Sequence, residues 1–172
     1  SSILDGGGEH RVVDVSDVMN GTVMLKGMTI KSGKSVSGFG AGGMYVGNSD
    51  VVLSNLLIES NDGGDGQGLG GGVYCYSGTM LMERCVLRSN MALYGGGLYV
   101  NSGVATLVGI TFESNTATRG DDIGNGGGII DVRGCPDGCD ETKGAAIDTW
   151  GTVSGDPYSY SCACDVVDAA VA

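Results

Sequence analysis

Short apolar runs alternate with polar positions along the whole chain, and clusters of glycine separate these runs. A clear example is the stretch 96–112, in which Gly96 and Gly97 precede Leu98-Tyr99-Val100 and a second apolar run follows. Short runs rich in Val, Ile, Leu and Thr are typical of β-strands, and the pattern lacks the period of an amphipathic helix. The pattern therefore predicts an all-β chain.

Two motifs recur along the chain at one common spacing. A glycine pair followed by a short apolar run occurs at 42–46, 71–75 and 96–100. A second motif, which ends in Ser-Asn, occurs at 58–61, 87–90 and 112–115. The step from the first copy to the second is the same for both motifs, and so is the step from the second copy to the third. Because two independent motifs keep one register, they indicate a true repeat.

A repeat of this length that contains only strand-like runs predicts a solenoid of stacked coils. Side chains alternate along a strand, so Leu98 and Val100 should face inward and Tyr99 outward. We predict a parallel β-helix of about five to six coils over residues 1–135. Residues 136–172 should form a cysteine-containing cap of the same domain.

Asn61, Asn90 and Asn115 fall at equivalent points of successive coils. Side-chain amides stacked in this way can hydrogen-bond to one another along the axis and to the buried backbone of the turns. We therefore predict a structural role for the three asparagines.

The glycine pair before an aliphatic residue and the motif Phe112-x-x-Asn115 resemble the repeats of the polymorphic outer-membrane protein family. The resemblance covers roughly residues 3–135 and implies a right-handed parallel β-helix. This chain departs from the family pattern because Gly stands in place of Ala before the aliphatic residue, and because Ile58 and Leu87 replace Phe. Such repeats occur in many surface and secreted proteins of microbes and algae, so the resemblance implies an extracellular location.

Four of the six cysteines lie close together near the end of the chain: Cys135, Cys139, Cys162 and Cys164. We expect the first two to form disulfides with the last two, which would hold the C-terminal segment over the last coil in an oxidising compartment. Cys75 and Cys85 map to inward positions of one coil, where they could form a disulfide or remain core thiols. The cysteines favour a secreted or cell-surface protein.

The net charge of −11, with only nine Lys and Arg residues and no basic cluster, makes nucleic acid and anionic lipid poor partner candidates. No stretch is long and apolar enough to span a membrane. The single N-glycosylation sequon, Asn20-Gly21-Thr22, agrees with secretion.

Aspartates provide the candidate catalytic and metal-binding chemistry. Asp62 and Asp65 lie in the longest loop between coils, and Asp121 and Asp122 occupy the equivalent corner two coils further on. Clustered carboxylates could act as acids and bases, and Asp62 with Asp65 could bind calcium. Three arginines, Arg84, Arg88 and Arg119, could stabilise charge beside them. The alternative, which we favour, is that Asp and Gly form turns here.

Tyr45, Tyr74 and Tyr99 should form an outward column on one face of the solenoid. Exposed aromatic rings could bind sugar rings or a protein partner. The alternative is that the rings stack on one another and stiffen the sheet.

Three functions follow from these observations. We favour a non-enzymatic module for structure, adhesion or assembly, because packing alone accounts for the repeat. The second is a lyase or hydrolase that acts on an acidic polysaccharide through the aspartates. The third is a segment or subunit of something larger, because residues 1–8 read as the middle of a coil and would leave an open first coil for a protein partner or a longer parent chain. No cofactor other than calcium is expected.

Overall fold

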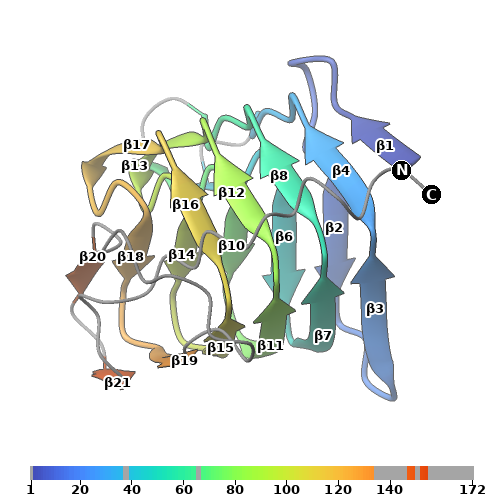
Figure 1. The fold of residues 1–172 in the computed structure, drawn as a ribbon, viewed down its shortest axis with the longest axis vertical. Helices are drawn as coiled ribbons and strands as arrows, with labels where there is room; N and C mark the ends of the chain where they lie inside the picture. The colour runs from blue at the N-terminus through green and yellow to red at the C-terminus, as the bar shows by residue number, and fades with distance from the viewer. Residues whose placement is uncertain (1, 37–38, 65–66, 134–146, 150–151, 155–172) are drawn as a thin grey trace.

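The chain folds as a parallel β-solenoid of about five turns, and the part of it that is described contains no helix (Figure 1). This computed structural model describes residues 2–36, 39–64, 67–133, 147–149 and 152–154. Successive coils contribute strands to three long sheets, in which neighbouring strands pair in parallel. The prediction of an all-β parallel solenoid is therefore confirmed.

The three sheets run the length of the solenoid. Sheet 1 contains β1 (Ser2–Asp5), β4 (Met28–Lys31), β8 (Leu57–Glu59), β12 (Val86–Arg88) and β16 (Thr111–Glu113). Sheet 2 contains β2 (Val13–Ser16), β6 (Met44–Gly47), β10 (Val73–Cys75), β14 (Leu98–Val100), β18 (Ile123–Asn125) and β20 (Ile147–Thr149). Sheet 3 contains β3 (Thr22–Lys26), β7 (Ser49–Ser54), β11 (Gly78–Glu83), β15 (Val104–Val108), β19 (Ile129–Arg133) and β21 (Thr152–Ser154).

The register between coils follows the spacing of the sequence repeat. Val73 of β10 pairs with Met44 of β6 on one side and with Leu98 of β14 on the other. Leu87 of β12 is paired in the same way, with Ile58 and Phe112. Residues that share a place in the repeat therefore stack directly above one another.

The main core is one cluster of apolar side chains inside the coil. Leu98 and Val100 are fully buried, as the alternation predicts, and they pack in one cluster with Leu107 and Phe112 of the other two sheets. Since each layer is covered by the layers on both sides, burial depends on the stacking of neighbouring coils.

The corners of the coils are formed by residues with left-handed backbone. A serine with φ between 52° and 54° precedes each ladder asparagine, and a serine precedes Gly33 at the same place in the first coil. These serines are Ser32, Ser60, Ser89 and Ser114. The corner between sheets 3 and 1 also has positive φ in successive coils, at Gly27, Asn55, Arg84 and Gly109. The same local turn is thus repeated from coil to coil with different side chains.

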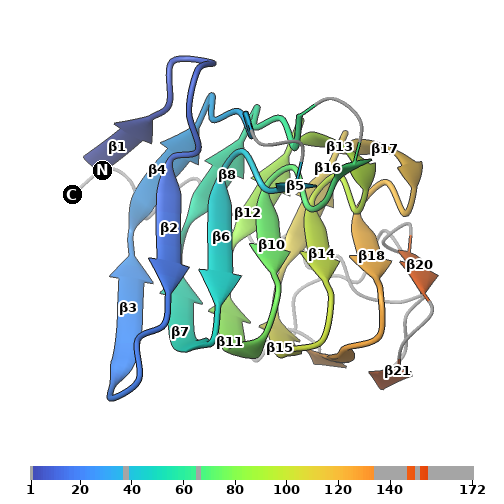
Figure 2. The same cartoon turned by 180° about the vertical axis from the view of Figure 1, so that it is seen from behind.

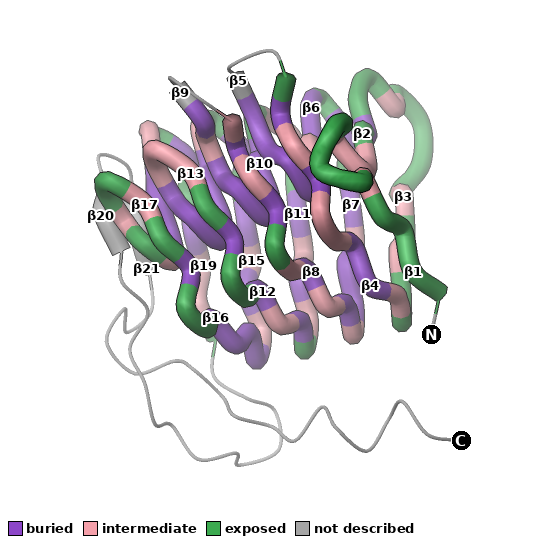
Figure 3. The backbone as a smooth tube through the Cα atoms, turned by 90° about the horizontal axis from the view of Figure 1, so that it is seen from above, coloured by how far each residue is buried: buried purple, intermediate pink, exposed green. Residues whose placement is uncertain are grey.

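One corner carries a second, smaller layer. The segments that join the asparagine position to the glycine pair are long at 33–43 and 61–72, where they contain β5 (Phe39–Gly40) and β9 (Gln67–Gly68). The shorter segments of the next two coils contain β13 (Met91–Tyr94) and β17 (Thr116–Arg119). β5 pairs with β9 and β13 with β17, so this corner forms its own short ladders (Figure 3).

The first coil has an open edge among the described strands. β1, β2 and β3 are each the outermost strand of a sheet, and every residue of β1 is exposed (Figure 3). Ile3 and Met24 are 58% and 70% exposed.

At the other end, β20 and β21 fall in the range predicted for the cap and extend sheets 2 and 3. The cysteines predicted to staple the cap, Cys135, Cys139, Cys162 and Cys164, lie outside the described residues.

Candidate functional site

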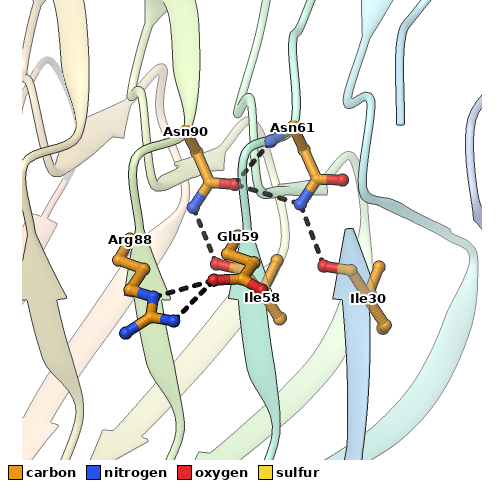
Figure 4. Close-up of polar contacts among 6 residues, drawn as sticks. All are labelled: Ile30, Ile58, Glu59, Asn61, Arg88 and Asn90. Carbon is orange, nitrogen blue, oxygen red and sulfur yellow. Dashed lines mark hydrogen bonds and ion pairs between the residues drawn. The ribbon is translucent and has the colours of Figure 1, made fainter. Parts of the chain in front are cut away.

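Three buried asparagines, Asn61, Asn90 and Asn115, form a ladder along the solenoid axis. Figure 4 shows the first two of them. Asn61 Nδ2 donates to Asn90 Oδ1 at 3.0 Å, and Asn90 Nδ2 donates to Asn115 Oδ1 at 3.1 Å. Each Nδ2 also donates to a carbonyl of the preceding coil, at Ile30, Ile58 and Leu87 respectively. The amides therefore join adjacent coils, as predicted.

The carbonyl ends of the same amides satisfy turn backbone. Oδ1 of Asn61 accepts from Gly33 N at 2.9 Å, and Oδ1 of Asn90 accepts from Asn61 N at 3.1 Å. At the far end of the ladder, Asn115 Nδ2 donates to Asp122 Oδ1 at 3.0 Å. The described part of the ladder thus ends on a carboxylate.

The second glycine of each pair lies close to the backbone of the next coil, and at two of the pairs it also lies close to a ladder amide. A Cβ added to Gly72 would lie 2.6 Å from the carbonyl oxygen of Gly97 and 3.1 Å from Asn90 Nδ2. Gly43 is confined in the same way by Gly72 and the amide of Asn61. The backbone carbonyl of the next coil, with the amide beside it, leaves no room for a methyl group at either position.

The tyrosine column has the predicted register, because Tyr74 pairs with both Tyr45 and Tyr99. The expected exposure is wrong for two of the three: Tyr74 and Tyr99 are each only 6% exposed. They pack with Ala41, Leu69 and Tyr94, which belong to the corner segments beside sheet 2. Ring centroids 5.5–5.7 Å apart in edge-to-face geometry make the column a second small core.

Among the described residues, the exposed aromatic side chain beside this column is Tyr76, which the sequence pattern does not mark. It is 43% exposed, and its ring stacks on that of Tyr45 with centroids 6.4 Å apart. The guanidinium of Arg11 lies 4.8 Å from the Tyr45 ring centroid. Tyr76 lies just beyond β10, at a place that is Gly47 in the preceding coil, so no repeat pattern marks it.

Burial changes the acidity of the column. Desolvation raises the pKa of Tyr74 well above the ordinary value of a phenol. The pKa of Tyr45 is also raised, first by burial and then by the Asp14 carboxylate. Both phenols therefore stay neutral near neutral pH.

The proposed calcium ligand Asp62 holds a turn. Its Oδ1 accepts from Gly64 N at 2.8 Å, and its Oδ2 lies 3.7 Å from Lys34 Nζ. Asp65 lies outside the described residues. Within the described ranges, no group of three or more His, Cys, Asp or Glu residues is placed to hold a metal ion. Calcium binding at Asp62 and Asp65 stays a prediction.

The other candidate carboxylates also contact the protein itself. Asp121 Oδ1 accepts from Ala117 N at 2.8 Å, while Asp122 accepts from the asparagine ladder. Arg88 is bound to Glu59 and Arg84 Nε donates to Asn55 Oδ1. Two of the three candidate arginines thus contact partners other than the four candidate aspartates.

A column of alternating charge on sheet 1 was not foreseen. The residues in register are Asp5, Lys31, Glu59, Arg88 and Glu113. Lys31 Nζ lies 3.4 Å from Asp5 Oδ2, and Arg88 contacts Glu59 at 2.7 Å. The N–H of Gly7 and then Lys31 lower the pKa of Asp5. Each of these charges therefore has an opposite charge beside it in the stack.

Replacing Arg88 with glutamate should destabilise the solenoid, because three acidic side chains would then stand in adjacent strands. We expect the free energy of unfolding to fall by about 1 kcal/mol relative to Arg88→Gln, which removes the ion pair without adding repulsion. Urea unfolding of both variants measures this difference. It should shrink in about 1 M salt, and a difference that is independent of salt would contradict the electrostatic cause.

Cys75 and Cys85 are free, fully buried thiols, which decides between the two alternatives for this pair. Burial raises the pKa of each thiol from 9.0 to about 11. They act as small apolar side chains of the core.

The buried thiols should make the fold sensitive to alkali. The unfolded chain loses the Cys85 proton near pH 9.0, whereas the folded chain keeps it until about pH 11. Stability is therefore lost as pH rises through this window, by roughly 2–3 kcal/mol per thiol. Urea unfolding of Cys85→Ala and of the parent chain between pH 9 and about pH 11 measures this effect. The loss of stability across this range should be smaller in the variant by the contribution of one thiol. An equal loss in both proteins would contradict a raised pKa of Cys85 in the folded chain.

No family model, curated protein or solved structure matches the chain. The described ranges contain no helix that is long and apolar enough to span a bilayer.

Proposed function

We propose that the chain is a non-enzymatic β-solenoid module of a secreted or cell-surface protein, serving structure, adhesion or assembly. The observation that carries this proposal is that the described candidate aspartates accept hydrogen bonds from the protein itself. Asp62, Asp121 and Asp122 hold turns or the asparagine ladder. The described candidate carboxylates therefore accept hydrogen bonds from their own loop or corner, which supports a structural use for them.

The finer features of the architecture belong to the same proposal. We infer a right-handed winding and a relation to the polymorphic outer-membrane repeats, supported by the glycine pairs and by Asn61, Asn90 and Asn115 in register. We also infer disulfides between Cys135, Cys139, Cys162 and Cys164, in keeping with an oxidising compartment. The partner is a protein or further chain on the open first coil, or a polysaccharide.

Binding and cleavage can be separated in one experiment. The purified chain is incubated with acidic and neutral polysaccharides, with and without calcium, and both retention on the polymer and polymer length are measured. We expect unchanged polymer length under every condition. Shortening that is lost in Asp62→Asn, with an unchanged circular dichroism spectrum, would overturn the non-enzymatic proposal.

The stacked pair of the exposed Tyr76 and the half-buried Tyr45 gives the retention assay a defined target. If the chain adheres to a polysaccharide, Tyr76→Ala should weaken retention, because Tyr76 is the more accessible ring of the pair. The matched control is Val104→Ala on sheet 3, another partly exposed apolar side chain on a different face. Equal losses in both variants would exclude the tyrosine pair as the contact.

A further inference from the structure

The connection between β2 and β3 projects from the first coil. It spans residues 17–21 and extends beyond the corresponding connections of the next coils (Figures 1 and 2). Asn20, Gly21 and Thr22 are all exposed, and Met19 before them is 82% exposed. Gly21 has φ 117°, and no neighbouring atom lies within 4 Å of where its Cβ would be. The whole sequon is therefore open to solvent.

The side chain of Asn20 differs from those of the asparagines that form the ladder. Asn61, Asn90 and Asn115 are buried, and their amides are bound at both ends. Asn20 has no side-chain hydrogen bond within the described part of the chain. A large substituent on a ladder asparagine would separate two coils, whereas one on Asn20 would project into solvent.

We propose that Asn20 is an N-glycosylation site, used when the chain passes through the secretory pathway of a eukaryotic cell. Nδ2 of Asn20 attacks C1 of an oligosaccharide carried on a lipid pyrophosphate. The N–C1 bond forms, the C1–O bond breaks, the lipid pyrophosphate leaves, and the amide proton passes to a base of the transferase. Thr22 supplies the hydroxyl that the acceptor sequence requires.

The site rests on the extracellular location included in the proposed function. The chain has one sequon, so occupancy is a property of a single position. The glycan would stand immediately before β3, whose outer edge is unpaired among the described strands.

The test expresses the chain behind a signal peptide in a eukaryotic cell. Intact mass is measured before and after peptide-N-glycosidase, which releases the glycan and converts Asn20 to Asp, on secreted and on cell-retained protein. We expect one glycan on the parent chain and on Thr22→Ser, and none on Thr22→Ala or Asn20→Gln. Bacterially produced protein is the unmodified standard.

An unmodified Asn20 in folded protein from this pathway would overturn the proposal. So would a glycan that persists in Thr22→Ala and Asn20→Gln. The polysaccharide assay of the proposed function uses unglycosylated protein and gives its result independently. Failure of the glycan test and failure of the proposed function are therefore distinguishable.

Discussion

Replacing Asn90 with alanine is expected to lower the free energy of unfolding by about 3–5 kcal/mol. Asn90 is fully buried, and its amide makes four hydrogen bonds, to Asn61 N, Asn61 Nδ2, Ile58 O and Asn115 Oδ1. Alanine removes all four at once. A buried donor or acceptor left without a partner costs about 1–3 kcal/mol, so the loss exceeds that of an ordinary surface hydrogen bond.

Urea unfolding followed by circular dichroism measures this loss. The control is Asn48→Gly, which removes an exposed asparagine from a corner with φ 48°, where glycine is well tolerated. The Asn48 side chain also makes hydrogen bonds, to Asp17 and Ser77 of the adjacent coils, but these bonds are exposed to solvent. We expect a change of about 0.5 kcal/mol or less. Similar losses in the two variants would mean that the ladder adds no more than surface polar contacts do.

Gly71→Ala should destabilise the fold by about 3 kcal/mol or more. A Cβ at this position would overlap the carbonyl group of Met91 and lie 2.7 Å from the carbonyl oxygen of Gly96. Both are backbone groups of the next coil, so relief requires a shift of that coil and loss of its hydrogen bonds to this one. The glycine pairs that recur in the sequence are thus required by the close approach of successive coils.

The matched control is Gly27→Asn. Gly27 has φ 66° and no atom near its missing Cβ, and the next coil carries Asn55 with φ 52° at the same corner. Asparagine tolerates this backbone, so the change should cost about 0.5–1 kcal/mol or less. Urea unfolding of both variants compares Gly71, where neighbouring backbone leaves no space for a Cβ, with Gly27, where only the positive φ favours glycine. Full stability in Gly71→Ala would show that the coils can separate locally without cost.

Sequence spacing was enough to place residues in the stack. The two steps of the repeat predicted which side chains lie in register, and the pairing of Tyr74 with Tyr45 and Tyr99 follows them. The burial of Tyr74 and Tyr99 could not be predicted, because Leu69 and Tyr94 that pack beside them lie in corner segments of unequal length. Periodicity gives the order of the stack but not what the irregular segments cover.

The charged column shows a signal that the sequence did contain. Glu59, Arg88 and Glu113 recur at the same spacing as the ladder asparagines, and their signs alternate. The same spacing applied to charged residues would have identified this column. The hydrogen bond between Asn115 and Asp122 could not be predicted from the spacing. It joins two residues of one coil corner, and these residues do not occupy equivalent places of the repeat.

The corner segments have a consequence for how such a chain can evolve. Gene duplication or loss of one whole coil would keep the ladder asparagines and the glycine pairs in register, so coil number can change without redesign of the core. A change by a single coil would, however, place two like charges side by side in the charged column of sheet 1. Insertions are accommodated between the asparagine and the glycine pair, where the segment 61–72 is already longer than its counterpart 90–97. That corner can diverge in length and sequence without disturbing the ladder or the core, so new binding surfaces could arise there.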